Sequence, residues 1–247
     1  MCTVSVIGLV RGGAVGYRLV SNRDESPLRS PAEAPAWREL GDGLRGLWPT
    51  DPGASGTWIG VNDAGLALAI LNKNSGASTG TKGATSRGTL IPRLLSASTL
   101  DGADLMFKTL DLSALLPFRM LGIGFGAADI RAWSWSWDGA SFAARRDGRV
   151  PLCLASSGLG DALVEPRLDL FRDMVTSDPT PAAQDAFHRH RWQDRPETSV
   201  WMEREGARTV SISVCEVFAG AGNRASVSLE YTALDTPLGT LGPLVGS

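Results

Sequence analysis

The strongest constraint on the fold is a pair of β-hairpin patterns within the first 72 residues. The runs CTVSVIGLV (2–10) and GYRLVSN (16–22) are rich in β-branched and apolar residues, and the two glycines between them suit a tight turn. The runs TWIGVN (57–62) and LALAILN (66–72) make a second pair, joined by the turn sequence Asp-Ala-Gly. We therefore expect antiparallel sheet at the start of the chain.

The rest of the chain alternates between strand and helix patterns. Residues 26–56 hold five prolines and five glycines and predict a long surface loop, and the polar stretch 73–87 predicts a mobile segment. Apolar spacing predicts two helices between Leu90 and Leu110, and further helix in 161–192. Strands are expected in the segments 120–126, 129–139, 141–158, 199–204, 208–218 and 224–231. This order predicts one α+β domain over residues 1–247, with helices packed outside sheets.

Composition narrows the class of partner. The 24 basic and 26 acidic residues give a net charge of −2 without a run of like charges, so we expect no nucleic-acid partner and favour a small-molecule substrate or ligand. No apolar run approaches the roughly 18 residues of a membrane span, and we expect neither a span nor a secretory signal. The three cysteines are widely spaced, which predicts no disulfide framework or zinc site and favours the reducing cytoplasm.

Few residues carry recognisable chemistry, and Cys2 is the first candidate. Removal of Met1 would give Cys2 a free α-amino group beside its own thiol, so that one residue supplies both nucleophile and base. Cys153 and Cys215 lie in apolar β-prone runs and are expected to be buried small residues. His188 and His190 are two positions apart on a predicted helix and point to different faces, so we expect structural or solvated roles and no metal pair.

The sequence Asn-Arg-Asp-Glu at 22–25 ends the second predicted strand. The first hairpin brings it beside Cys2, since paired strands lie about 5 Å apart. Arg23 is then placed to lower the pKa of the thiol or to hold a substrate carboxylate, and Asp24 to bind the α-ammonium group. The alternative is a turn with a surface ion pair.

Together these segments resemble a known family. Met-Cys at the start, NRDE at 22–25, GTWIGVN at 56–62, LALAILN at 66–72 and SRG at 86–88 are similar to the NRDE family. The second hairpin also resembles that of the choloylglycine hydrolase group. Both resemblances imply the N-terminal nucleophile (Ntn) hydrolase fold, a four-layer αββα sandwich of two antiparallel sheets.

The resemblance also implies roles for individual residues. Cys2 matches the nucleophile, Asp24 the acid that holds the α-amino group, and Asn72 the side-chain donor of an oxyanion hole. Arg23 transfers less directly, because the hydrolase arginine precedes its aspartate by three residues, and Arg208 corresponds to a later hydrolase arginine or is a surface residue at a strand end. Ser156 or Ser157 stands where an asparagine is expected.

Three functions remain open at this point. The first is an amidohydrolase or acyltransferase that uses Cys2, needs no cofactor and acts on a small, partly hydrophobic acyl substrate. The second is a non-enzymatic carrier of haem or a lipid-type ligand on the same fold. The third is a structural member of the family that binds protein partners.

Overall fold

The first β-hairpin forms the middle of one sheet. The computed structural model describes residues 2–74, 85–127, 129–220, 222 and 224–234, and in it β1 (Cys2–Arg11) lies between β2 (Ala14–Glu25) and β10 (Leu152–Ser156). Beyond β2, the sheet continues with β12 (Ala207–Ala219), which pairs with both β11 (Glu203–Arg204) and β13 (Ala225–Ala233). All of these pairings are antiparallel.

The predicted tight turn joins β1 to β2. Arg11 and Ala14 are paired, and the two residues between them, Gly12 and Gly13, have φ values of 57° and 84°. Two consecutive positive φ values match the right-handed twist of the flanking strands and are costly for residues that carry a Cβ. The turn therefore fixes the register that places Cys2 opposite Arg23.

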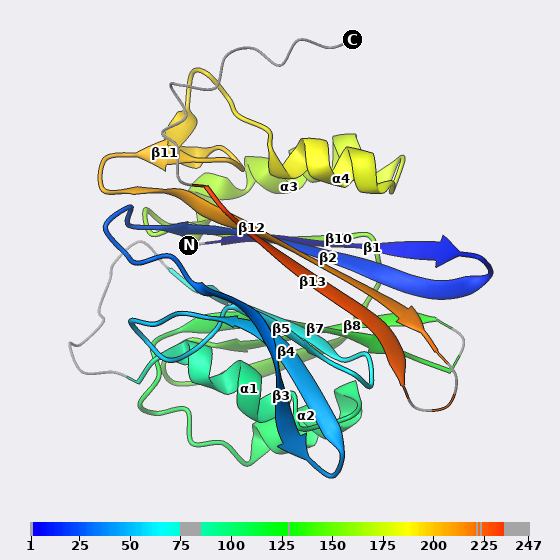
Figure 1. The fold of residues 1–247 in the computed structure, drawn as a ribbon. Coiled ribbons are helices and arrows are strands. Elements are labelled where there is room, and N and C mark those ends of the chain that lie inside the picture. The colour runs from blue at the N-terminus through cyan, green and yellow to red at the C-terminus, as the bar shows by residue number, and fades with distance from the viewer. Residues whose placement is uncertain (1, 75–84, 128, 221, 223, 235–247) are drawn as a thin grey trace.

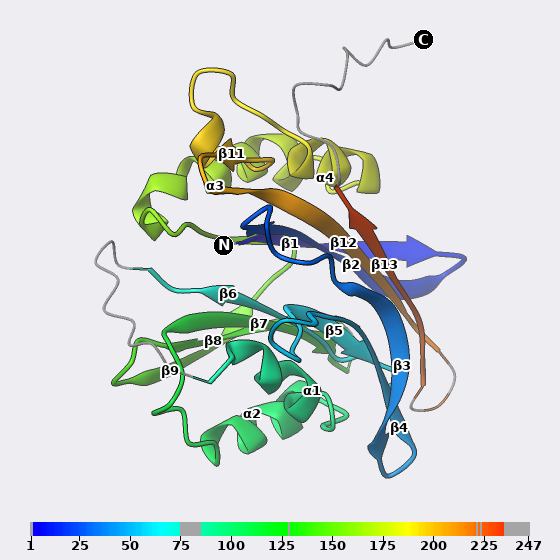
Figure 2. The same cartoon turned by 60° about the vertical axis from the view of Figure 1, so that its left-hand side comes forward.

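A second sheet runs in chain order. It contains β3 (Glu33–Gly41), β4 (Leu44–Thr50), β5 (Ile59–Asn62), β6 (Ala67–Asn72), β7 (Phe118–Phe125), β8 (Ile130–Trp137) and β9 (Phe142–Gly148), each antiparallel to the next. The predicted second hairpin is β5–β6. Asn72 is the last residue of β6, so the strand carries it to the sheet end that lies beneath the start of β1 (Figure 2).

Helices cover the outer face of each sheet, which gives the predicted αββα sandwich (Figure 1). The helices α3 (Pro166–Phe171) and α4 (Pro181–His188) lie on the first sheet, and α1 (Leu90–Leu94) and α2 (Leu100–Lys108) on the second. Single turns of 3-10 helix lie at η1 (Arg87–Thr89), η2 (Asp161–Val164) and η4 (Pro196–Thr198), and one π turn, η3, at Arg172–Thr176.

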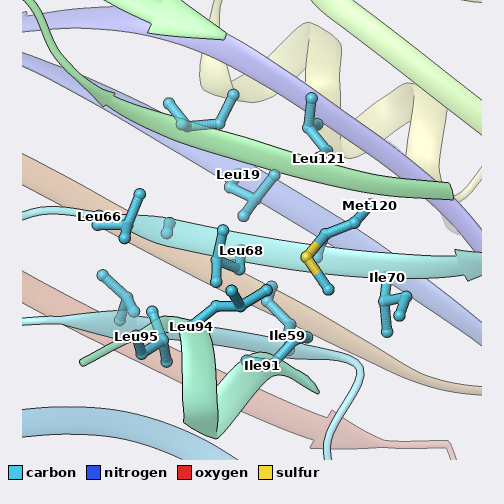
Figure 3. Close-up of a cluster of buried hydrophobic side chains, with 14 of the residues drawn as sticks. Leu19, Ile59, Leu66, Leu68, Ile70, Ile91, Leu94, Leu95, Met120 and Leu121 are labelled. Carbon is cyan, nitrogen blue, oxygen red and sulfur yellow. The ribbon is translucent and has the colours of Figure 1, made fainter. Parts of the chain in front are cut away.

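The main core lies between the sheets and extends under α1 and α2. It includes Leu19 of β2, Leu68 of β6, Met120 of β7 and Ile91 of α1, all of them 0% exposed (Figure 3). A smaller cluster packs the outer face of the first sheet against α3 and α4, with Phe187 at 0% exposure. Burial of apolar area on both faces of the sheets, at about 25 cal/mol per Å², is the main source of stability in such a fold.

Two sequence expectations, and the alternative of a surface turn at NRDE, need correction. The loop predicted over 26–56 is wrong for most of its length, because β3 and β4 form an edge hairpin there, in which β3 is largely exposed and the middle of β4 is buried. The strand expected over 199–204 reduces to the two residues of β11. NRDE is no surface turn but the buried end of β2, with Asp24 1% exposed. Most of the mobile segment predicted over 73–87 lies outside the described residues.

Candidate active site

Cys2 is held at the start of β1, between two neighbouring strands. It is paired with Arg23 on β2 and with Ser156 on β10, and its side chain is 6% exposed. The backbone N–H of Cys2 donates to the Ser156 hydroxyl oxygen at 3.3 Å. Ser156, one of the two serines predicted to stand where the family pattern has asparagine, therefore contacts the atom that would become the α-amino nitrogen.

The surroundings of the thiol do not by themselves ionise it. Burial raises the pKa of Cys2, and the Asp24 carboxylate raises it too, whereas Arg23 and a hydrogen bond from the Asp24 backbone N–H lower it. A thiol that stays protonated at neutral pH needs an adjacent base before it can act as a nucleophile.

Asp24 is buried behind the strand and bound by two residues far away in the sequence. Its carboxylate accepts a hydrogen bond from Thr209 Oγ1 at 2.7 Å and lies 3.5 Å from Arg167 Nη1. The same arginine donates to Thr3 Oγ1 at 2.7 Å and to the Thr198 carbonyl at 2.9 Å. Burial raises the pKa of Asp24, while Arg167 and Thr209 lower it. Sequence reasoning missed Arg167, and nothing in the local pattern of α3 marks it.

Arg23 points away from Asp24, toward the second sheet. Its guanidinium lies 2.5 Å from Asp51 Oδ2 and 4.4 Å from the centre of the Trp58 ring. Arg29 reaches the same Asp51 oxygen at 2.7 Å. Asp51 lies just after β4, in the segment taken for a loop, and was not identified as a candidate.

A pocket of about 430 Å³ opens beside the Cys2 side chain. Asn72 lines it from β6, and among the described residues the Asn72 side chain has no hydrogen-bond partner. Both sheets and the segment around η1 contribute to its wall. The residues that line it are Cys2, Arg23, Asp24, Glu25, Arg29, Asp51, Gly53, Ala54, Gly56, Thr57, Trp58, Ile70, Asn72, Thr85, Ser86, Arg87, Gly88 and Leu116.

Of the predicted site residues, Cys2, Arg23, Asp24 and Asn72 are brought together, and Arg208 is not. Arg208 lies near the start of β12, opposite Glu25 and Glu203, and is not among the residues that line the pocket. Arg87, which sequence reasoning cited only as part of the SRG motif, is among them.

The remaining cysteines and histidines lie elsewhere. Cys153 and Cys215 are buried, and burial raises the pKa of both thiols. His188 is 0% exposed, with Nε2 2.7 Å from Ser5 Oγ and Nδ1 2.8 Å from Asn22 Oδ1, and burial lowers its pKa to about 3. These contacts make it a neutral structural residue.

Neither histidine borders the pocket, so its lining offers no imidazole to a haem iron. The haem-carrier alternative remains a prediction. In the described part of the chain, no three His, Cys, Asp or Glu side chains gather as metal ligands. None of the helices found there is long and apolar enough to cross a membrane.

Known proteins resemble the chain in sequence over one half and in fold over most of its length. The family model described as Transport and Golgi organisation 2 matches residues 1–128. Two variants of the conjugated bile acid hydrolase from Clostridium perfringens each give a TM-score of 0.50, at 13% and 12% identity. The alignments cover 94% and 95% of this chain and 97% of theirs.

The Caenorhabditis elegans orthologue of N-acylethanolamine-hydrolyzing acid amidase gives a TM-score of 0.52 at 13% identity, with 85% of this chain and 91% of that chain covered. A search of curated proteins gave no match. At such identities the structural likeness establishes the fold, which is the predicted Ntn-hydrolase sandwich. The family match spans more than half of the chain, including Cys2, NRDE, Asn72 and Arg87, and the chain therefore belongs to the Transport and Golgi organisation 2 family.

Proposed function

We propose that the protein is an N-terminal-cysteine amidohydrolase that acts on an amide of a small, partly hydrophobic acyl compound. The observation that carries the proposal is the position of Cys2. Its side chain borders the pocket, and its backbone nitrogen lies beside the Ser156 hydroxyl. The buried Asp24, next to Arg23 on β2, borders the same pocket. Trp58, Ile70 and Leu116 give the pocket an apolar part that suits an acyl chain.

Removal of Met1, before catalysis, makes the Cys2 nitrogen a free amine. An α-amine has an ordinary pKa of about 8, and it takes the proton of the thiol. The pKa of a cysteine thiol is about 8.5 in water, and burial raises the pKa of Cys2 above its ordinary value. The thiolate then forms a bond to the substrate carbonyl carbon. Asp24 orients the α-ammonium that results, and Arg167 lowers the pKa of Asp24 against the rise caused by burial, which favours the ionised form.

Asn72 is placed to stabilise the charge that develops on the carbonyl oxygen. Its side chain lines the same pocket as the thiol and has no hydrogen-bond partner among the described residues, so its N–H groups are available to an oxyanion. The α-ammonium gives its proton to the leaving amine as the carbon–nitrogen bond breaks. Water, activated by the same amine, hydrolyses the thioester, and attack by an amine instead of water would make the reaction an acyl transfer.

The structural neighbours support an amide substrate by analogy. They are named as a bile acid hydrolase and an amidase, and they share the fold at 12–13% identity. Since one fold serves many functions, the proposal depends on the pocket chemistry described above.

Two measurements test the proposal. Intact-mass spectrometry should find the purified protein shorter by one methionine, and iodoacetamide should then label Cys2 faster than the buried Cys215. Hydrolysis of a panel of N-acyl amides, neutral and carboxylated, should be abolished by Cys2→Ala and unaffected by Cys215→Ala. Retention of Met1 in the active protein, or full activity in Cys2→Ala, would overturn the proposal.

A further inference from the structure

Arg87 is the one pocket arginine, among those in the described residues, that forms no ion pair with a carboxylate. We propose that the Arg87 guanidinium binds a carboxylate of the substrate, so that the amide cleaved at Cys2 belongs to an anionic acyl compound. This inference rests on the proposed function for the cleavage step, but the binding it predicts can be measured without catalysis.

The other two arginines of the pocket are already paired. Arg23 and Arg29 share the Asp51 carboxylate at 2.5 and 2.7 Å, and Arg29 also lies 3.3 Å from Glu25. Their charges are therefore largely used within the protein, and both arginines hold the pocket wall in shape.

Arg87 has different surroundings. Its Nη1 donates to the Pro117 carbonyl at 2.9 Å, and in the described ranges no carboxylate lies within ion-pair distance of it. A guanidinium has five N–H donors in a planar fork, so most of its donors remain for a ligand. The carboxylate is the group that matches this fork with two parallel hydrogen bonds.

The guanidinium belongs to the same pocket as the reacting sulfur and is partly removed from water. Burial lowers the pKa of Arg87, and the negative charges of Glu25 and of a Cys2 thiolate act in the opposite direction. A half-buried cation without a counter-ion loses hydration that a ligand anion can replace. An anion bound there would lie in the same pocket as the amide that the thiol attacks.

The backbone around Arg87 is fixed, so the guanidinium is presented from a rigid base. Ser86 caps η1 by accepting from the Gly88 N–H, and Thr57 N–H donates to the Gly88 carbonyl at 3.1 Å. A Cβ on Gly88 would lie 2.8 Å from the Thr57 carbonyl oxygen, and a Cβ on Gly56 would lie 2.8 Å from the Gly88 carbonyl carbon. Only glycines allow the two segments this approach, which gives the SRG and GTW motifs a shared role in placing Arg87.

Binding is tested in Cys2→Ala, which cannot turn over. Isothermal titration calorimetry is done with two pairs of probes. The first pair is N-hexanoylglycine and its neutral amide, N-hexanoylglycinamide. The second pair is glutaryl anilide, which carries its carboxylate on the acyl side, and the methyl ester of that compound. We expect one carboxylated probe to bind about 10- to 100-fold more tightly than its neutral partner. The pair that shows the difference identifies the side of the amide that carries the anion.

The same titrations in Arg87→Gln and Arg87→Lys separate recognition from general damage. Arg87→Gln should abolish the preference without weakening the neutral probes, and Arg87→Lys should keep part of it, because the charge remains but the fork is lost. Arg93→Gln, an exposed arginine of the adjacent α1, is the matched control and should change nothing.

Turnover by the protein with Cys2 intact then distinguishes the two proposals. Tight carboxylate-dependent binding without hydrolysis would remove the proposed amidase and leave the Arg87 site standing. Equal affinity for the charged and neutral probes in both pairs would overturn the inference. An equal loss of affinity for charged and neutral probes in Arg87→Gln would also overturn it.

Discussion

The buried pair of Arg167 and Asp24 allows a quantitative test of how the site is supported. The two side chains are 1% and 0% exposed, and Arg167 also donates to Thr3 and to the Thr198 carbonyl. Arg167→Met keeps most of the apolar stem of the side chain and removes the cation. Because it leaves a carboxylate buried without its counter-ion, we expect the free energy of unfolding to fall by about 3–5 kcal/mol at pH 8.

The loss should depend on pH in a defined direction. Arg167 lowers the pKa of Asp24 against the rise caused by burial, so that pKa rises further in the variant. The pKa of an aspartate is about 3.9 in the unfolded state. When the pKa is higher in the folded state, the folded protein loses stability as the pH rises from about 3.9 to the folded-state pKa. The deficit of the variant relative to the parent should therefore be smaller at pH 5 than at pH 8.

Urea unfolding at the two pH values, followed by tryptophan fluorescence, provides the measurement. Arg172→Met is the matched control, because Arg172 pairs with Asp169 at 3.0 Å with both side chains 67% exposed, and such surface pairs contribute about 0–1 kcal/mol. Adding Asp24→Asn to Arg167→Met should recover stability at pH 8, since it removes the unpaired charge. The reasoning is refuted if Arg167→Met costs no more than the control at pH 8, or the same at both pH values.

Three further predictions concern other parts of the site and its scaffold. Asn72→Ala should lower kcat by about 100- to 1,000-fold with little change in KM, measured on any amide that the parent hydrolyses; an unchanged kcat would exclude the oxyanion role. Gly88→Ala places a Cβ 2.8 Å from the Thr57 carbonyl oxygen and should cost about 1–3 kcal/mol in thermal unfolding, whereas Gly8→Ala, with its nearest contact at 3.5 Å, should stay within about 1 kcal/mol. The pKa of His188 is about 3 in the fold, below its ordinary value of 6.5, so its contribution to the free energy of unfolding is present above pH 6.5 and about 2 kcal/mol of it is lost by pH 5. His188→Gln should remove this part of the pH dependence of unfolding, and an unchanged pH profile would contradict the assignment.

Local patterns predicted the parts of the fold that depend on neighbouring residues. The hairpin of β1 and β2 follows from two glycines between apolar runs, and its register alone places Cys2 opposite Arg23. Sequence reasoning missed the edge hairpin of β3 and β4 because its prolines and glycines, and the largely exposed residues of β3, resemble a loop. An edge strand tolerates these residues, since one side of it needs no partner.

Residues that approach from distant segments were beyond local patterns. Arg167 meets Asp24 across 143 positions of the chain, and Asp51 meets Arg23 from a segment predicted to be irregular. A charged residue in a short helix is exposed in most proteins, so burial of Arg167 becomes evident only when α3 is placed on the sheet.

Arg23 and Asp24, the two charged residues at the centre of NRDE, are neighbours in the sequence but contact different layers of the sandwich. Successive residues of a strand point to opposite faces, so β2 directs Arg23 between the sheets, to Asp51 and Trp58, and directs Asp24 toward α3 and Thr209. The sequence expectation gave Arg23 the thiol or a substrate carboxylate as its partner and Asp24 the α-ammonium group, and it did not foresee the contacts of Arg23 with Asp51 or of Asp24 with Arg167. In the fold both residues border the pocket, but Arg23 is paired with Asp51 and Asp24 contacts Arg167 and Thr209. Exchange of the two residues would place an aspartate beside Asp51 and an arginine beside Arg167, so we expect the exchanged variant to lose both ion pairs.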